Sequence, residues 1–420
     1  MFQISSFGEK FGKVTGIGEL MNDIGDAMQK PDEAILMGGG NPARIPEMQK
    51  VFCSLLGKIA DTDNFGKIIS SYDSPQGNED FLQKTAEYFH RTFGWNVTRS
   101  NIAVTNGSQN AFFYLLNMFS GKFSDGSKKK ILFPMVPEYI GYADQTLDDD
   151  SLCSYLPKIE YTGKHSFKYH VDFDALKIDE NIGAICVTRP TNPTGNVITD
   201  EEMDKLLDLA KKHDIPLIID NAYGQPFPGI LFCETKTLFD KNIIHSFSLS
   251  KLGLPSLRTG IIVADEEIIK MISNMNAVVN LASGTFGQTL TAEFIAEDKI
   301  TELSRSVITP FYKKRSQEAL AMISRYFPDN LPYYVHENEG AFFLWLWFPK
   351  LPVSCYELYR RLKSRNVYII PGCYFFPGCE EFSEMKNECI RITFSQEPTV
   401  LEKGIRILAE EVTKLYGGEL

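Results

Sequence analysis

Several features that define common protein classes are missing from this chain of 420 residues. Its eight cysteines include no C-x-x-C pair, so the sequence indicates neither a zinc ribbon nor a redox centre of that type. Its six histidines are dispersed, and we expect no metal site. The dinucleotide pattern G-x-G-x-x-G is also absent, which counts against a dinucleotide-dependent oxidoreductase.

Long apolar runs and an excess of positive charge are missing as well. No run approaches the length of a membrane helix, and the first ten residues carry neither a basic nor a continuous apolar segment. The net charge is -11, which argues against a nucleic-acid partner. We therefore expect a cytoplasmic protein with reduced thiols that binds neither membranes nor nucleic acid. The length favours one large domain and one smaller one.

Three short apolar runs in the middle of the chain each end in a polar cluster. Runs of this length, rich in β-branched residues and separated by helical patterns, are typical of buried parallel strands. The carboxyl ends of such strands meet along one edge of a sheet, where ligands bind. The runs are residues 184–188, 216–220 and 243–247, and the clusters are residues 191–195, 220–223 and 248–251. The sequence therefore predicts an α/β fold with its functional site at that edge.

A turn between a predicted strand at 101–105 and a helix that runs to Phe119 contains Gly107, Ser108 and Gln109. Free N–H groups and the positive dipole end at a helix start can bind a phosphate. The same sequence is equally typical of an ordinary strand-to-helix turn, so both interpretations stay open. A further strand ends shortly before Tyr139, which places this ring near the same edge.

Helical and strand patterns organise the rest of the chain. The segment from Thr199 to Glu202 matches a capping box and opens a helix between two of the central strands. Residues 150–180 show no regular pattern, and we expect an irregular segment there. Long helical patterns from Asp265 to about Phe327 precede alternating strands and helices. The expected division is an N-terminal segment at 1–45 that packs with the small domain, a large domain at 46–300 and a small domain at 301–420.

Lys251 follows a buried strand and has Leu252 and Leu254 beside it. A lysine in apolar surroundings loses its charge more easily, and the neutral amine is a nucleophile. Most lysines at strand ends are simply solvated, so the neighbours decide the interpretation. Each neighbour fits a different part of pyridoxal phosphate.

The polar residues at the predicted sheet edge divide among the parts of that cofactor. Asp220 ends an apolar run, where a lone carboxylate would be costly, and it could pair with the ring nitrogen. Tyr223 and Asn192 could donate to the ring oxygen. The remaining positions are Ser248, Arg258 and the amides of 107–109 for the phosphate, and Tyr139 for the ring face.

The order of these motifs resembles that of fold-type-I pyridoxal-phosphate aminotransferases of the aspartate aminotransferase superfamily, over nearly the whole chain. The motifs are Asn192-Pro193-Thr194-Gly195, Asp220-x-x-Tyr223, Ser248-x-Ser250-Lys251 and Arg258. The resemblance implies a large domain with a mostly parallel sheet flanked by helices and a smaller C-terminal α/β domain. It implies that Lys251 bonds the cofactor and shuttles a proton, with Asp220 and Tyr223 as further catalytic residues.

The resemblance also implies a substrate site and a partner. Arg391 matches the small-domain arginine that clamps the substrate carboxylate, with Gly40 and Asn192 beside it. Tyr72 matches the tyrosine that reaches the phosphate of the neighbouring subunit, which implies a homodimer with shared active sites. Ser250 belongs to the cofactor-binding set.

Four further segments resemble the branch of this family that transfers an amino group between valine and pyruvate. They are residues 38–43, 189–197, 250–255 and 374–378. This closer resemblance implies that valine and pyruvate give 3-methyl-2-oxobutanoate and alanine. Both substrates carry one carboxylate, so the side-chain pocket should be apolar, and its candidates are Ile17, Tyr368 and Phe376.

Other functions on the same scaffold stay open. An aromatic or broad-specificity aminotransferase or a C–S lyase would use the same cofactor and fold, because a fold does not fix the reaction. A pyridoxal-phosphate-binding regulator is disfavoured, because the chain shows no basic DNA-binding module.

Overall fold

A large sheet of eight strands forms the centre of the computed structural model, which describes residues 2–29, 33–61, 65–381 and 383–417. The strand order is β2-β11-β10-β9-β8-β4-β3, with β5 beside β4. All strands except β3 and β11 run in the same direction. The strands are β2 (Ile102–Thr105), β3 (Gly121–Lys122), β4 (Lys128–Phe133), β5 (Leu152–Ser154), β8 (Ile182–Thr188), β9 (Leu217–Asp220), β10 (Ile243–Ser248) and β11 (Gly260–Val263).

The three strands predicted from apolar runs lie side by side in this sheet. Every residue of β8, β9 and β10 is buried, because helices cover both faces of a parallel sheet. The helix between β8 and β9 starts with the predicted capping box, in which Thr199 and Glu202 each bond the other's backbone. The expectation of an α/β fold is confirmed for this part of the chain.

The helices of the first 300 residues mostly surround the large sheet, and their apolar faces account for their positions. In α5, Phe81, Leu82 and Phe89 are buried on one face. The helices are α1 (Ser6–Phe11), α2 (Gly16–Met28), α3 (Pro46–Ala60), α4 (Phe65–Ser70), α5 (Glu79–Phe93), α6 (Ser108–Phe119), α7 (Asp200–Lys212), α8 (Glu266–Asn280), α9 (Thr285–Ala296) and α10 (Lys299–Leu303).

A second sheet of six strands has the order β15-β16-β13-β12-β7-β6. Its strands are β6 (Lys158–Tyr161), β7 (Ser166–His170), β12 (Tyr334–His336), β13 (Phe343–Trp347), β15 (Ile370–Pro371) and β16 (Cys389–Thr393). The expectation of an irregular segment at 150–180 is therefore wrong. This segment contains β5, β6 and β7, and β7 pairs with β12 from the C-terminal part of the chain. The pairing of β7 with the distant β12 leaves no local signal in the sequence, whereas β6 and β7 pair with each other as a local hairpin.

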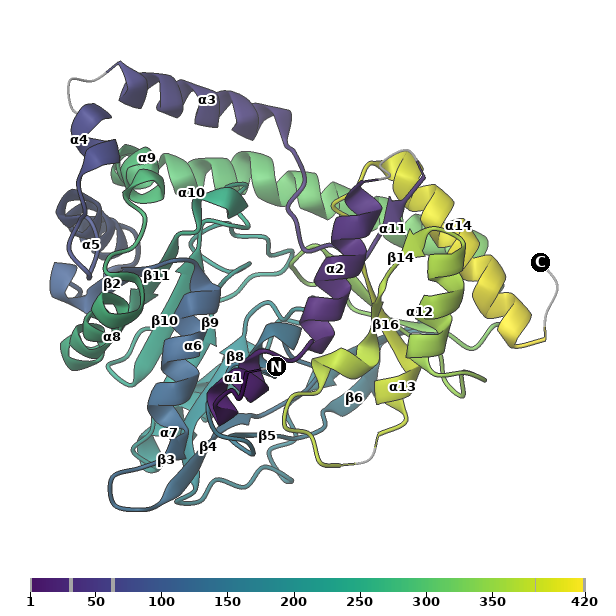
Figure 1. Ribbon diagram of the computed structural model, residues 1–420. Helices are drawn as coiled ribbons and strands as arrows, with labels where there is room; N and C mark the ends of the chain where they lie inside the picture. Colours follow the sequence, from purple (N-terminus) through teal and green to yellow (C-terminus); the bar gives the residue numbers. More distant parts are fainter. Residues whose placement is uncertain (1, 30–32, 62–64, 382, 418–420) are drawn as a thin grey trace.

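The C-terminal helices pack around this second sheet. They are α11 (Thr309–Tyr326), α12 (Cys355–Ser364), α13 (Met385–Glu388) and α14 (Pro398–Leu415). A small parallel pair joins the N-terminal segment to this region, β1 (Ile35–Leu36) with β14 (Val367–Tyr368). Figure 1 shows α2 between the large sheet and the helices α12 and α14. The predicted smaller α/β unit is thus present, while its boundary at residue 301 stays a prediction.

Candidate active site

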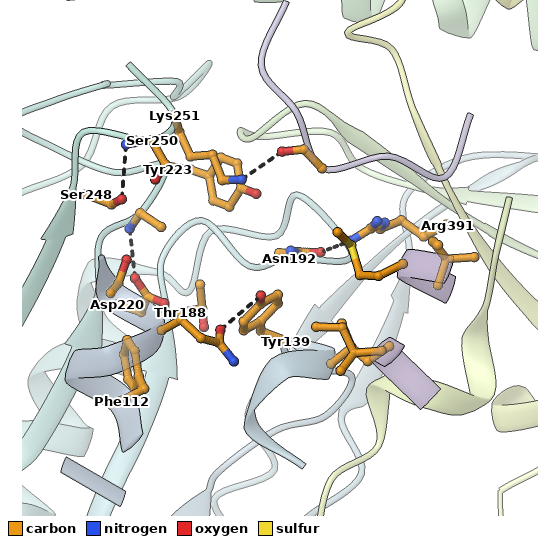
Figure 2. Close-up of a pocket in the computed structure, with 18 of the residues that line it drawn as sticks. Phe112, Tyr139, Thr188, Asn192, Asp220, Tyr223, Ser248, Ser250, Lys251 and Arg391 are labelled. Atoms are coloured by element: carbon orange, nitrogen blue, oxygen red, sulfur yellow. Dashed lines mark hydrogen bonds between the residues drawn. The ribbon is translucent and has the colours of Figure 1, made fainter. Parts of the chain in front are cut away.

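A pocket opens where the carboxyl ends of β8, β9 and β10 meet the second sheet. The polar residues predicted for this edge converge there (Figure 2). Those that line the pocket are Gly40, Ser108, Gln109, Tyr139, Asn192, Asp220, Tyr223, Ser248, Ser250, Lys251, Arg258 and Arg391. Two of the residues predicted to bind the cofactor lie outside the lining: Gly107 is adjacent to it in the turn before α6, and Tyr72 is 83% exposed.

Lys251 holds its amine in the interior of the pocket. Its Nζ donates a hydrogen bond of 2.7 Å to the carbonyl oxygen of Gly40, in the N-terminal segment. It lies 5.7 Å from the ring centroid of Tyr223 and 5.8 Å from that of Phe342. Burial lowers the pKa of Lys251 to about 8, and the positive charges of Arg391 and Arg258 act in the same direction. The amine is therefore much closer to its neutral, nucleophilic form than an ordinary lysine is.

Asp220 ends β9 and is only 5% exposed. Its Oδ2 accepts a hydrogen bond of 2.8 Å from the hydroxyl of Tyr142, and its Oδ1 accepts one of 2.9 Å from the amide of Ala222. Burial raises the pKa of Asp220 to about 6, while these two hydrogen bonds and Lys251 oppose the rise. The site thus contains an interior carboxylate that suits a cationic group.

Arg391 reaches the pocket from β16, on the side of the second sheet (Figure 2). Its Nη1 donates to Oδ1 of Asn192 and its Nη2 to the carbonyl oxygen of Gly38, both at 2.7 Å. Its guanidinium carbon lies 4.1 Å from the ring centroid of Phe343 and 5.2 Å from that of Phe375. Burial lowers the pKa of Arg391 to about 10, and its Nε has no hydrogen-bond partner among the described residues. A buried cation without a carboxylate partner fits an anionic ligand.

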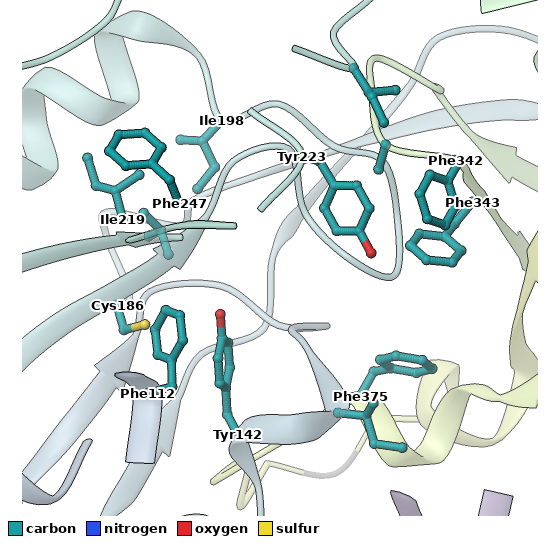
Figure 3. Packing of buried hydrophobic residues seen from close by; sticks show 14 of the residues in the cluster. Phe112, Tyr142, Cys186, Ile198, Ile219, Tyr223, Phe247, Phe342, Phe343 and Phe375 are labelled. Carbon is teal, nitrogen blue, oxygen red and sulfur yellow. The ribbon is translucent and has the colours of Figure 1, made fainter. Parts of the chain in front are cut away.

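The contact with Arg391 also orients Asn192. Because Oδ1 of Asn192 faces the guanidinium, the Nδ2 donor is directed to another partner. Tyr223 packs its ring edge-on against Phe342 and Phe343, with centroids 5.2 and 5.7 Å apart (Figure 3). These contacts fix both polar side chains relative to the pocket.

The start of α6 forms another part of the pocket wall, away from Arg391. Gly107 has φ +84, and a Cβ there would lie 2.2 Å from Nη2 of Arg258. Glycine is therefore needed for the guanidinium to lie against this turn. Tyr139 donates from its hydroxyl to Oε1 of Gln109 at 3.3 Å. The turn before α6 presents backbone N–H groups to the pocket, and the guanidinium of Arg258 beside it adds one positive charge.

Sequence reasoning missed several residues of this site. Glu138, Thr188 and Tyr142 form a buried hydrogen-bonded chain that ends on Asp220. Glu138 stands one position before the predicted Tyr139, but no spacing pattern marked it. The apolar face of α2 was represented only by Ile17, although Leu20, Met21 and Ile24 also line the pocket. Their spacing of three and four residues could have shown that they share one face. Tyr368 and Phe376 do not line the pocket.

The similarity of the whole chain to known proteins agrees with this geometry. Residues 59–408 match the family model of aminotransferase class I and II. The chain belongs to this family.

Individual relatives narrow the similarity further. The chain is 50% identical to a valine–pyruvate aminotransferase of Escherichia coli (strain K12), over 98% of both chains. It is 48% identical to the crystal structure of the valine-pyruvate aminotransferase AvtA from Salmonella typhimurium LT2, with a TM-score of 0.89 over 96% of this chain and 100% of that one. LysN, an α-aminoadipate aminotransferase from Thermus thermophilus complexed with N-(5'-phosphopyridoxyl)-L-leucine, shares the fold at 20% identity with a TM-score of 0.77, over 99% of this chain and 98% of that one. The predicted fold-type-I architecture and the predicted aminotransferase family are confirmed.

Proposed function

We propose that this chain is a pyridoxal-phosphate-dependent aminotransferase that exchanges an amino group between valine and pyruvate. The observation that carries the proposal is the arrangement of Lys251, Asp220 and Arg391 around one pocket, in a chain half identical to a valine–pyruvate aminotransferase. The products would be 3-methyl-2-oxobutanoate and alanine.

The charges in the pocket fit pyridoxal phosphate. The lining contains the cations Lys251, Arg258 and Arg391 and a single carboxylate, Asp220. This excess of positive charge suits a phosphate and a substrate carboxylate together, and the interior carboxylate suits a protonated ring nitrogen. When bound, the cofactor supplies an electron sink that no amino-acid side chain provides.

Each predicted residue has a position consistent with a part of the cofactor. The free Nδ2 of Asn192 and the hydroxyl of Tyr223 would donate to the ring oxygen. The phosphate would lie against the start of α6, where backbone amides, hydroxyls and a guanidinium meet. The residues we assign to it are Gly107, Ser108, Gln109, Ser248, Ser250 and Arg258, with Tyr139 over the ring face.

The catalytic work of the chain itself falls to three side chains. Lys251 would hold the cofactor through its Nζ and, as a neutral amine, would move the proton at the substrate α-carbon. Asp220, in its ionised form, would pair with the ring nitrogen and favour a proton on that nitrogen. Arg391 binds the carboxylate, and since both substrates carry a single carboxylate, it serves both half-reactions.

The side-chain selectivity of the pocket would come from α2. Ile17, Leu20, Met21 and Ile24 face the pocket together with Ile370. An apolar wall of this kind favours an isopropyl or methyl group over a charged one. No cation other than Lys251, Arg258 and Arg391 appears among the lining residues to bind a side-chain carboxylate. This composition favours valine and alanine over acidic amino acids.

A second copy of the chain would complete the site. Tyr72 is 83% exposed, and we assign it to the phosphate of the neighbouring subunit in a homodimer. Within each subunit we propose an N-terminal segment at 1–45, a large domain at 46–300 and a small domain at 301–420.

The visible spectrum of the purified holoenzyme tests the function. Valine should bleach the band of the lysine-bound cofactor, and pyruvate added afterwards should restore it. A band that returns without pyruvate, or keto-acid release with loss of a side-chain group, would instead indicate a lyase. A protein that binds no pyridoxal phosphate would contradict the proposal.

A further inference from the structure

A hydrogen-bonded chain of four side chains runs from the interior of the large sheet to Asp220. Oε2 of Glu138 lies 2.7 Å from Oγ1 of Thr188, which lies 3.0 Å from the hydroxyl of Tyr142. The Tyr142 hydroxyl in turn lies 2.8 Å from Oδ2 of Asp220. All four residues are buried, with exposures between 0% and 5%. The chain joins two carboxyl groups through two hydroxyls.

Surrounding groups hold this chain in place. Oε1 of Glu138 accepts from the amide of Thr188 at 3.0 Å, and Oε2 accepts from the amide of Tyr139 at 3.2 Å. The backbone amide of Glu138 donates to the carbonyl oxygen of Phe375 at 2.8 Å. Tyr142 packs its ring against Phe112, with centroids 4.8 Å apart (Figure 3), and against Phe133, with centroids 5.5 Å apart. The geometry therefore leaves little freedom for another pairing.

The number of protons available decides the total charge of these four side chains. Three gaps between oxygen atoms must each contain one proton, but the hydroxyls of Thr188 and Tyr142 supply only two. With both carboxyls ionised, Thr188 donates to Glu138 and Tyr142 donates to Asp220, so the two hydroxyl oxygens would face each other at 3.0 Å with no proton between them, which is costly for buried groups. One carboxyl must therefore carry the third proton.

The position of that proton follows from the surroundings of the two carboxyls. Asp220 faces Lys251 and accepts from the amide of Ala222, both of which favour its ionised form. Burial raises the pKa of Glu138 to about 8, although the hydrogen bonds from Thr188 and from the amide of Tyr139 oppose the rise, and the neighbouring charge of Asp220 contributes to it. Two other titratable groups lie close to Glu138. They are Tyr142 and Cys186, and burial raises the pKa of each, so both are neutral. Glu138 is thus the better proton carrier.

We propose that Glu138 is a protonated positioning residue whose hydroxyl donates through Thr188 and Tyr142 to Asp220, so that Asp220 stays ionised toward the ligand it faces. This role rests on the proposed function, in which that ligand is the ring nitrogen of the cofactor. Moving each of the three protons one oxygen along the chain would neutralise Asp220 and ionise Glu138. This shift neither adds nor removes a proton. The hydrogen bonds therefore decide which of the two carboxyls is charged, while the total charge of the four side chains stays the same.

Infrared spectroscopy of the cofactor-free protein tests the proton on Glu138. At neutral pH the wild type should show the carbonyl band of a buried protonated carboxylic acid, shifted in D₂O. Glu138→Gln should lack this band, because its amide replaces the donor without a titrating group. Glutamate labelled with carbon-13 at the side-chain carboxyl should move the band in the wild type, which tests the assignment even if the variant does not fold. A band that persists in Glu138→Gln and ignores the glutamate label would overturn the proposal.

A matched pair of variants at the centre of the chain tests its effect on Asp220. Thr188→Val keeps the volume but removes the hydroxyl, and Thr188→Ser keeps the hydroxyl. For Thr188→Val we expect kcat with valine to fall about tenfold, the loss of one buried hydrogen bond, with KM within about twofold. Thr188→Ser should recover kcat to within about threefold of the wild type.

The spectrum of the holoenzyme separates this role from mere packing. The pH at which the cofactor absorbance changes should move in Thr188→Val and stay in Thr188→Ser. An unchanged pH profile and kcat in Thr188→Val would show that the chain does not act on Asp220. If the wild type binds no pyridoxal phosphate, the proposed function fails, while the infrared result still decides whether Glu138 is protonated.

Discussion

The guanidinium of Arg391 lies 4.1 Å from the ring centroid of Phe343 while it donates to the carbonyl oxygen of Gly38. A carbonyl oxygen cannot neutralise a buried cation, so the charge of Arg391 is available to a substrate carboxylate. The contact with the ring and the two hydrogen bonds to Asn192 and Gly38 hold the planar guanidinium in place, which favours bidentate contact with a carboxylate.

Arg391→Lys should therefore weaken both substrates together. A lysine keeps the charge but not the planar fork, and we expect KM for valine and for pyruvate to rise on the order of tenfold to a hundredfold. Steady-state kinetics with each substrate varied in turn measures the effect, with the cofactor absorbance unchanged. Arg325→Lys, at an exposed ion pair with Glu402, is the matched control and should leave both constants unchanged. A change confined to one substrate would contradict a shared carboxylate site.

Replacement of Lys251 by alanine should abolish transamination without destabilising the fold. The amine is buried, and burial disfavours its charged form, so its removal takes away an unfavourable interaction. We expect no amino transfer above background and a melting temperature of the cofactor-free protein at or above that of the wild type. Single-turnover mixing with valine and a thermal scan give the two readouts. Substantial turnover by Lys251→Ala would assign the amine to another residue.

The rate at which the cofactor-free protein bonds pyridoxal phosphate should depend on pH through Lys251. The folded pKa of about 8 lies below the ordinary value of 10.5, so the amine is mostly protonated below pH 8 and mostly neutral above it. Since only the neutral amine attacks, the rate should rise about tenfold per pH unit below 8 and level off above it. Stopped-flow absorbance measures this profile. A rise that continues to pH 10 would mean that the pKa of Lys251 is not lowered.

Subunit mixing tests the shared site. Lys251→Ala should be inactive because it lacks the amine that bonds the cofactor. Tyr72→Ala should be inactive at limiting cofactor because the neighbouring site loses a phosphate contact. Hybrid dimers combine one intact Lys251 with one intact Tyr72 from the other subunit, so denaturing and refolding an equal mixture should restore about a quarter of the wild-type activity. Refolding each variant alone is the control. No recovery in the mixture would place Tyr72 outside the neighbouring site.

Two glycine-to-alanine substitutions should change the free energy of unfolding in opposite directions. One tests close packing in the large sheet, and the other tests the helix preference of alanine. A Cβ at Gly183 in β8 would lie 1.8 Å from the carbonyl oxygen of Phe119, so Gly183→Ala should cost about 3 kcal/mol of unfolding free energy. Gly57 is exposed in α3 with nothing within 4 Å of the place that a Cβ would take, and Gly57→Ala should stabilise the protein by about 0.5–1 kcal/mol. Denaturant titration of both variants measures the difference. Equal stability of the two would contradict the close approach of Phe119 to β8.

The sequence predicted those parts of the site that follow local rules. Asp220 ends one apolar run and Lys251 follows another within four residues, and the alignment of strand ends in a parallel sheet brings them together. Arg391 was identified only by resemblance, because β16 is about 140 residues away from Lys251 in the chain and nothing in its spacing points to the pocket. Its contacts with Gly38 and Asn192 depend on three separate segments.

Glu138 escaped prediction for a different physical reason. A glutamate before an aromatic residue ordinarily lies in solvent, and only the closure of the backbone against Phe375 and Thr188 buries it. The hairpin of β6 and β7 is local, but its place in the second sheet was not predictable because its partner β12 begins only at Tyr334. Long-range pairing of this kind is set by the whole fold rather than by its own residues.

Because β6 and β7 belong to the second sheet, that sheet can form only after strands from distant parts of the chain have been synthesised. This hairpin leaves the ribosome long before β12, β13 and β16, and it must wait for them with one edge open. A fragment that begins at residue 301 would lack the hairpin, so β12 would present unpaired N–H and C=O groups to other copies. We therefore expect the segment 301–420 to aggregate when expressed alone, because its sheet is completed by strands from the preceding part of the chain.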